Sequence, residues 1–219
     1  MTESSLADAL DRHVAELRAC RRCPRVLAPP VAADPVASPS ILLVGQAPGP
    51  RERETNRLFA YTAGTRLFSW FASVGASEEA FRERVWMSAT IRCFPGRQPA
   101  GGDRAPAPDE IAACAPYLER EIELLRPELV LAIGTLAIGR FLPTSSLSER
   151  VGQMFRSRMA GHEFDVLPLP HPSGRSTWIN QPQNAHLLDN ALRLLAESAV
   201  WRRTFAVRPA SEDPGEDSI

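Results

Sequence analysis

Short apolar runs alternate along the chain with segments in which apolar residues recur every three or four positions. The runs lie at 41–44, 85–89, 129–133 and 164–167. Largely apolar runs of this length are typical of strands buried on both faces of a parallel sheet, and the longer spacing is typical of helices with one buried face. The sequence therefore predicts an α/β fold, a three-layer α/β/α sandwich with a central four-stranded parallel sheet and right-handed crossovers.

The helical spacing is clearest in three segments, residues 6–17, 108–125 and roughly 183–201. The first helix should deliver the chain to Cys20. A proline and two acids at 108–110 suit the start of the second helix. Its spacing places Cys114 on the buried face.

Length and composition indicate one domain with a generous core. The chain has 219 residues, of which 44% are hydrophobic and 23% charged, as in ordinary globular proteins. We expect a single domain over residues 1–204, with an irregular Ala/Pro-rich connector at 28–39. Residues 205–219 are expected to form a disordered acidic tail.

Charge and hydropathy say little about partners. The formal net charge is −1, and all 25 basic side chains are arginine. A genome rich in G and C explains the missing lysine, so the arginine count alone does not indicate phosphate binding. A local patch could still bind nucleic acid. With no secretory signal and no long apolar run, we expect a cytoplasmic protein of a bacterium or archaeon without a membrane partner.

The four cysteines, Cys20, Cys23, Cys93 and Cys114, are all the chain contains. In a reducing compartment, closely spaced cysteines ligate metals more often than they form disulfides. The sequence therefore predicts a metal or cluster site. Zinc and an iron–sulfur cluster both accept four thiolates, so the spacing leaves both open.

Two turn-rich loops follow the first and last predicted strands, at 45–49 and 171–174. The carboxyl ends of parallel strands share one edge of the sheet, where ligands bind in such folds. Glycine-flanked loops can present backbone N–H groups there, and Gln46 can both donate and accept. Taken singly, either loop could be a plain turn, and His171 a structural histidine.

These features together carry a resemblance to a known family. The matching residues are Gly45-Gln46-Ala47-Pro48-Gly49, Glu52, Phe59, Ala63-Gly64, Cys93, the segment 108–119 and His171-Pro172-Ser173. From about residue 8 to about 197, the chain resembles the iron–sulfur uracil-DNA glycosylases called family 4. The resemblance implies a structural 4Fe-4S cluster on the four cysteines. It also implies a monomeric, monofunctional hydrolase that removes uracil from DNA in base-excision repair; a sliding clamp is a conceivable further partner.

The resemblance also implies roles for individual residues. Phe59 would stack on the flipped base, and the backbone of the loop at Gly45 and Ala47 would read its edge. His171 would donate a hydrogen bond to the departing uracil anion, and Gln46 or Glu52 would place the water. The loop carrying Ser173, Gly174, Arg175 and Trp178 would enter the minor groove. Phosphate contacts could come from Arg51, Arg53, Arg57 and Arg66.

The chain departs from the family at three positions and in the segment 55–59, which lacks the family's usual Gly-Arg-Pro-Phe form. The family usually has Glu at the position of Gln46, related glycosylases have Asp at that of Ala47, and a base-reading Asn stands where this chain has Ala89. Substitute readers could be Ser88, Thr90, Asn56 or Asn180. The sequence therefore leaves open which nucleobases the protein recognises.

Several alternatives follow from these departures. The substrate could be another deaminated base such as hypoxanthine. The protein could also be a non-catalytic binder of uracil or abasic DNA, or a cluster protein with no DNA role. A covalent DNA-trapping relative is less compatible, because no His-bearing insert follows Gly49.

Overall fold

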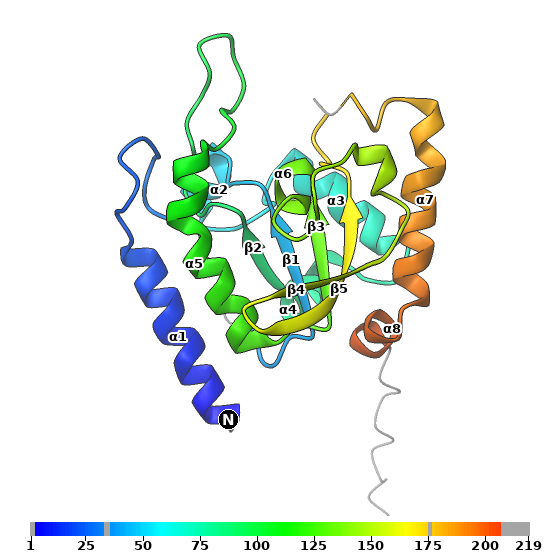
Figure 1. Cartoon of the computed structure of the whole chain (residues 1–219), viewed down its shortest axis with the longest axis horizontal. Helices are drawn as coiled ribbons and strands as arrows, with labels where there is room; N and C mark the ends of the chain where they lie inside the picture. The colour runs from blue at the N-terminus through cyan, green and yellow to red at the C-terminus, as the bar shows by residue number, and fades with distance from the viewer. Residues whose placement is uncertain (1–2, 33–35, 175–176, 207–219) are drawn as a thin grey trace, which may run out of the picture.

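A computed structural model describes residues 3–32, 36–174 and 177–206. Its centre is a five-stranded sheet with strand order β2-β1-β3-β5-β4 (Figure 1). The strands are β1 (Ile41–Gly45), β2 (Trp86–Ala89), β3 (Leu129–Ile133), β4 (Phe155–Met159) and β5 (His162–Leu169). Almost all of the predicted acidic tail lies outside the described residues.

All four predicted strands are present and parallel, as β2, β1, β3 and β5. The fifth strand, β4, was not predicted. It pairs antiparallel with β5 at the edge of the sheet, and its sequence Phe-Arg-Ser-Arg-Met alternates half-buried and exposed positions. An edge strand with one solvated face lacks the continuous apolar run by which buried strands are recognised.

Strand β1 shows why the sheet is covered on both sides. Ile41 and Leu43 belong to one apolar cluster and Leu42 and Val44 to another, since successive side chains of a strand point to opposite faces. The first face is covered by α3 (Thr62–Ala72), α4 (Glu78–Arg84), α7 (Pro182–Glu197) and α8 (Ala199–Phe205), and the second by α1 (Glu3–Ala19), α5 (Pro108–Leu125) and α6 (Thr135–Ile138). The predicted three-layer sandwich is confirmed (Figure 1).

The last predicted helix is divided in two. Ser198 has extended backbone angles (φ −66°, ψ 135°), and its side chain accepts a hydrogen bond from the Trp201 backbone N–H at 3.2 Å. This side-chain cap satisfies an N–H that a new helix would otherwise leave unpaired. The chain therefore turns at Ser198 between α7 and α8, although the apolar spacing continues across it.

A buried polar network joins α1, α5 and the end of β2. Arg92 donates to both carboxylate oxygens of Glu121, at 2.8 and 2.5 Å. Ser88 Oγ donates to the same carboxylate at 2.8 Å, and His13 Nε2 lies 3.4 Å from it. Burial alone would raise the pKa of Glu121, but Arg92 and His13 outweigh it and lower the pKa to about 2.

In the described part of the chain, no helix combines the length and apolar character that a bilayer-spanning segment needs.

Candidate functional site

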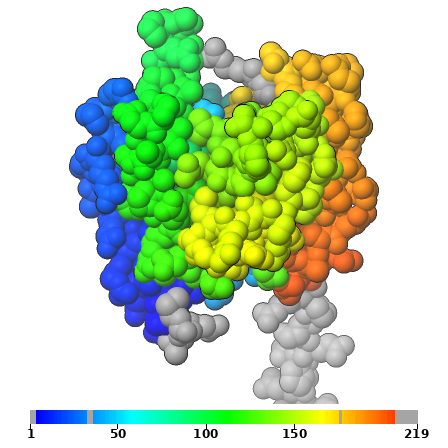
Figure 2. All heavy atoms as spheres, in the orientation of Figure 1, coloured from blue at the N-terminus to red at the C-terminus, as the bar shows by residue number. Residues whose placement is uncertain are grey.

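A cleft of about 700 Å³ opens at the carboxyl ends of the parallel strands. Its walls come from the loop after β1 and the short helix α2 (Pro50–Thr55), from residues 58–63, from the segment 95–104, and from His171 and Ser173 after β5. The two loops predicted to share this edge of the sheet therefore do so. In Figure 2 the segment that leads from β2 to α5 projects beyond the body of the molecule.

Phe59 and Gly45 form a closely packed wall of the cleft. A Cβ placed on Gly45 would lie 2.9 Å from Phe59 Cζ, closer than real Cβ contacts allow. Phe59 itself has φ +53°, a conformation uncommon for a bulky residue. Gly64 makes this turn possible, since a Cβ there would lie 1.7 Å from the Phe59 carbonyl oxygen.

Glu52 holds this wall together. Its carboxylate accepts hydrogen bonds from the backbone N–H groups of Gly49 and Phe59, both at 2.5 Å. Burial raises the pKa of Glu52 despite these bonds. Because each oxygen already has a backbone partner, the geometry makes Glu52 a residue that positions Phe59 against the loop after β1.

His171 lies in the cleft in a defined tautomer. The Ser173 backbone N–H donates to His171 Nδ1 at 3.2 Å, so Nδ1 is unprotonated and the proton resides on Nε2. Burial lowers the pKa of His171, which favours this neutral form. Gly134, with φ +83°, allows the close approach of the ring, because a Cβ on it would lie 3.2 Å from His171 Cβ.

Three further predicted positions line the cleft: Gln46, Ala47 and Ala89. Within the described residues, neither the Gln46 side-chain amide nor the Ala47 backbone N–H has a hydrogen-bond partner. Both can therefore bind a ligand. Ala89 contributes only an apolar methyl group at the position where the family has an Asn that hydrogen-bonds to the base.

Other predicted residues are not brought to the cleft. Ser88 is fully buried and donates to Glu121. Asn56 ends α2 in the left-handed conformation and accepts from the Ala32 backbone N–H at 3.3 Å. Trp178 is half-buried, and its indole N–H donates to Ser148 Oγ at 2.8 Å.

The predicted minor-groove loop is described only in part. Ser173 lines the cleft. Gly174 is exposed, and a Cβ on it would have no neighbour within 4 Å. Arg175 lies outside the described residues.

The structure adds cleft residues that the sequence did not indicate, chiefly Tyr61, Arg97 and Asp103. The backbones of Arg97 and Asp103 form an isolated antiparallel bridge across a tight hairpin. Asp103 Oδ2 lies 3.7 Å from where a Cβ on Gly49 would stand, and the carboxylate has no basic partner among the described residues. A hairpin of Gly, Pro and polar residues carries no periodicity, so no local signal marks Asp103.

The four cysteines surround a second, mainly apolar cavity of about 70 Å³. Burial and the neighbouring cysteines raise the pKa of Cys93 to about 12, and burial also raises the pKa values of Cys23 and Cys114. Four thiolates in such a place need a compensating cationic centre. Among the described residues, no three metal-ligating side chains converge as they would around one ion. The four cysteines nevertheless line one cavity, and four thiolates are a donor set that either a zinc ion or an iron–sulfur cluster accepts.

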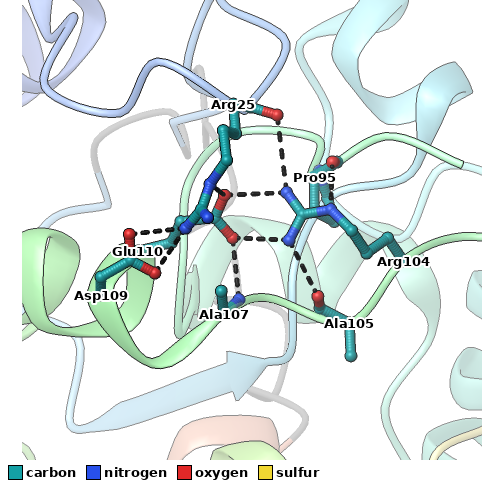
Figure 3. A network of polar contacts seen from close by, with 7 residues as sticks. All are labelled: Arg25, Pro95, Arg104, Ala105, Ala107, Asp109 and Glu110. Carbon is teal, nitrogen blue, oxygen red and sulfur yellow. Dashed lines mark hydrogen bonds and ion pairs between the residues drawn. The ribbon is translucent and has the colours of Figure 1, made fainter.

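Arginines and acids form a polar network between the two cavities (Figure 3): Glu110 lines the cysteine cavity, and Arg104 lines the cleft. Arg104 donates to both oxygens of the buried Glu110 carboxylate at 2.8 Å and to the Pro95 carbonyl at 3.0 Å. The Arg104 hydrogen bonds are the main reason that the pKa of Glu110 is lowered. Arg25, near Cys23, pairs with Asp109 and lies 3.6 Å from Glu110. The base of the 95–104 segment is thereby attached to the cysteine region.

Comparison with known proteins gives consistent matches. A family model described as the Uracil DNA glycosylase superfamily matches residues 33–196. A protein of Sulfurisphaera tokodaii named type-4 uracil-DNA glycosylase is 25% identical over 209 residues, covering 91% of this chain and 89% of its own. Proteins of the same name are 27% identical in Saccharolobus solfataricus, covering 76% of each chain, and 30% identical in Thermotoga maritima, covering 61% of this chain and 64% of the relative.

Proposed function

The chain belongs to the uracil DNA glycosylase superfamily, and from that membership we propose that it removes uracil from DNA by hydrolysing the N-glycosidic bond, leaving an abasic site. The observation that carries the proposal is His171, a neutral imidazole in the strand-end cleft whose proton is placed on Nε2 by the Ser173 N–H. The relatives named type-4 uracil-DNA glycosylase support the same substrate. We assign the activity to a single domain over residues 1–204.

The reaction requires a base that has left the helical stack, because the glycosidic bond is inaccessible within it. Phe59 offers the wall on which a flipped base would stack, and the Ala47 backbone N–H offers a donor to its edge. Water then attacks C1′ as the C1′–N1 bond breaks, and the bonding electrons remain on uracil as an anion. His171 Nε2–H donates toward the carbonyl oxygen where this charge grows. One such donor contributes about 2.7–4 kcal/mol to the barrier reduction in comparable sites.

The attacking water needs an acceptor in the cleft. Glu52 is poorly suited, because both of its oxygens already accept backbone hydrogen bonds. Gln46 and Asp103 line the same cleft, and within the described residues neither side chain has a polar partner. We therefore assign water placement to Gln46, with Asp103 as the carboxylate that takes up the proton of the water.

The cofactor proposed for the second cavity is a 4Fe-4S cluster ligated by Cys20, Cys23, Cys93 and Cys114. When bound, it would supply cross-links between the N-terminal helix, the segment after β2 and α5, with no part in the chemistry at uracil. Purified protein should be brown and absorb near roughly 400 nm. Cys93→Ser should reduce that absorbance, and a colourless protein with one bound zinc would refute the assignment.

The DNA substrate would lie across the mouth of the cleft. Ser173 and Gly174 offer a loop that a phosphate can approach closely. Of the four arginines suggested by the sequence, Arg51 alone lines the cleft. Arg53 donates to the Ala28 carbonyl and Arg57 lies 3.5 Å from Glu78.

The test is a single-turnover excision assay on an oligonucleotide with one uracil, read as alkali-labile strand breaks. His171→Ala should lower the rate constant roughly 10²–10³-fold, as removal of such a donor does elsewhere. His186→Ala is the matched control, because His186 is exposed on α7, away from the cleft, and should excise at the wild-type rate. Equal excision rate constants for His171→Ala and His186→Ala would refute the role assigned to His171.

A second candidate substrate is another deaminated base, such as hypoxanthine. Ala89 favours it, because a methyl group in the cleft wall neither requires nor rejects a particular base edge. A panel of oligonucleotides that carry uracil, hypoxanthine or xanthine separates the candidates. Binding without turnover on every lesion would instead indicate a non-catalytic binder.

A further inference from the structure

Tyr61 is an exposed aromatic residue at the mouth of the cleft. It directly precedes α3, lines the cleft and is 55% exposed. Among the described residues, only Leu27 is a comparably exposed large hydrophobic. Phe59, two residues earlier, is 8% exposed and packs against Gly45. The two rings therefore occupy different levels of the cleft, Phe59 in its wall and Tyr61 at its rim.

Arg51 accompanies Tyr61. Its guanidinium carbon lies 5.2 Å from the centroid of the Tyr61 ring, within the range of a cation–π contact. Arg51 belongs to the first turn of α2 and also lines the cleft. No acid among the described residues forms an ion pair with it, so its charge is available to an anion at the rim.

We propose that Tyr61 and Arg51 form a second base-binding platform, on which an unpaired nucleobase next to the flipped one stacks while Arg51 contacts its phosphate. Aromatic side chains beside a basic group are how proteins bind single-stranded nucleic acid without sequence readout. In duplex DNA the neighbouring base remains paired and stacked within the helix. The platform therefore favours single-stranded over duplex substrates. This inference rests on the proposed function, because it takes DNA as the ligand.

The experiment measures binding of the full-length protein to single-stranded and duplex oligonucleotides that carry one 2′-fluoro-deoxyuridine, which resists glycosidic cleavage. Tyr61→Ala should weaken single-strand binding roughly 5- to 150-fold, the equivalent of about 1–3 kcal/mol for one stacked base. Duplex binding should change less than twofold. Tyr61→Phe keeps the ring and should bind like the wild type.

Two further variants test the components. Leu27→Ala is the matched control, since Leu27 is exposed but absent from the cleft lining, and it should leave both affinities unchanged. Arg51→Gln should reduce the salt dependence of single-strand binding by about one phosphate contact, a slope change of about 0.7. A thermal melt establishes that each variant is folded.

The proposal is overturned if Tyr61→Ala binds single strands like the wild type, if Tyr61→Phe is as weak as Tyr61→Ala, or if single-strand and duplex affinities fall equally. Uracil excision by the wild type separates this failure from that of the proposed function. Excision with no effect of Tyr61→Ala refutes the platform alone. A Tyr61-dependent preference for single strands without excision refutes the glycosylase and supports the platform.

Discussion

Glu121 and Arg92 form an ion pair whose removal should be among the most destabilising single changes in this protein. Their side chains are 1% and 2% exposed, and the carboxylate accepts two hydrogen bonds from the guanidinium. Glu121→Gln keeps the shape of the side chain but leaves the Arg92 charge buried without a counter-charge. Because Arg92 precedes Cys93 and lines the cysteine cavity, the damage should extend to the proposed cluster site.

The expected cost is about 3–5 kcal/mol, the usual result of breaking a buried ion pair from one side. For a domain of this size, each kcal/mol corresponds to about 2–4 °C, so the midpoint of thermal unfolding should fall by roughly 6–20 °C. The exposed pair Arg193–Glu197, with side chains 57% and 60% exposed, provides the control. Glu197→Gln should cost at most about 1 kcal/mol.

Circular dichroism melts of both variants, with iron content measured in parallel, check the prediction. Adding Arg92→Met to Glu121→Gln should restore part of the lost stability, because the uncompensated charge is then gone. Two results would contradict this reasoning. One is a Glu121→Gln variant with the same unfolding midpoint as Glu197→Gln. The other is a double variant, Glu121→Gln with Arg92→Met, that is less stable than Glu121→Gln alone, because the carboxylate would then not be compensating a buried charge.

The same ion pair predicts how the stability of the protein depends on pH in the acid range. The pKa of Glu121 is lowered from the usual 4.5 to about 2, so its contribution to stability is present above pH 4.5 and is lost as the pH falls toward 2. Wild-type stability between these values should therefore depend on pH more steeply than that of Glu121→Gln. Parallel curves would contradict the depressed pKa.

Three further predictions concern the cleft. Gly64→Ala should displace the Phe59 carbonyl, 1.7 Å from the new methyl, and abolish excision, whereas Gly174→Ala, with open space around it, should leave the melting temperature unchanged. Asp103→Asn should lower the single-turnover rate constant about 10²-fold with little change in affinity; an unchanged rate would show that Asp103 does not take up the proton of the water. Because burial lowers the pKa of His171, excision should persist below pH 6.5 and decline only when protonation displaces the Ser173 N–H; an inflection above 6.5 would contradict this.

Much of the fold could be predicted because its signals are local. Each buried strand is a short apolar run, and the face of α5 is spaced at three and four residues. The run before Gly45 is sufficient to place the following loop at a ligand-binding edge. The edge strand β4 and the turn at Ser198 escaped prediction, because one is half polar and the other depends on a single side-chain cap within a continuous apolar pattern.

The candidate site was less predictable, because the availability of a polar group depends on partners that lie far away in the sequence. Ser88 was a reasonable base reader until Glu121, 33 residues later, accepted its hydroxyl. Glu52 was a reasonable acid until the Phe59 backbone N–H occupied one of its oxygens. Asp103 carried no signal, and only the folding of its hairpin over Gly49 brought it to the cleft.

By itself, the sequence determined the layered architecture, the edge of the sheet where the cleft opens and the four cysteines that line one cavity, because hydrophobic periodicity and residue type act over a few neighbouring positions. The tertiary structure alone decided which side chains remain free to meet a substrate. A buried hydroxyl or carboxylate must find a partner wherever the chain supplies one, and that partner is chosen by packing in three dimensions. The cleft residues left over, Gln46, Tyr61, Asp103 and the Nε2 proton of His171, are the ones that we propose meet the substrate.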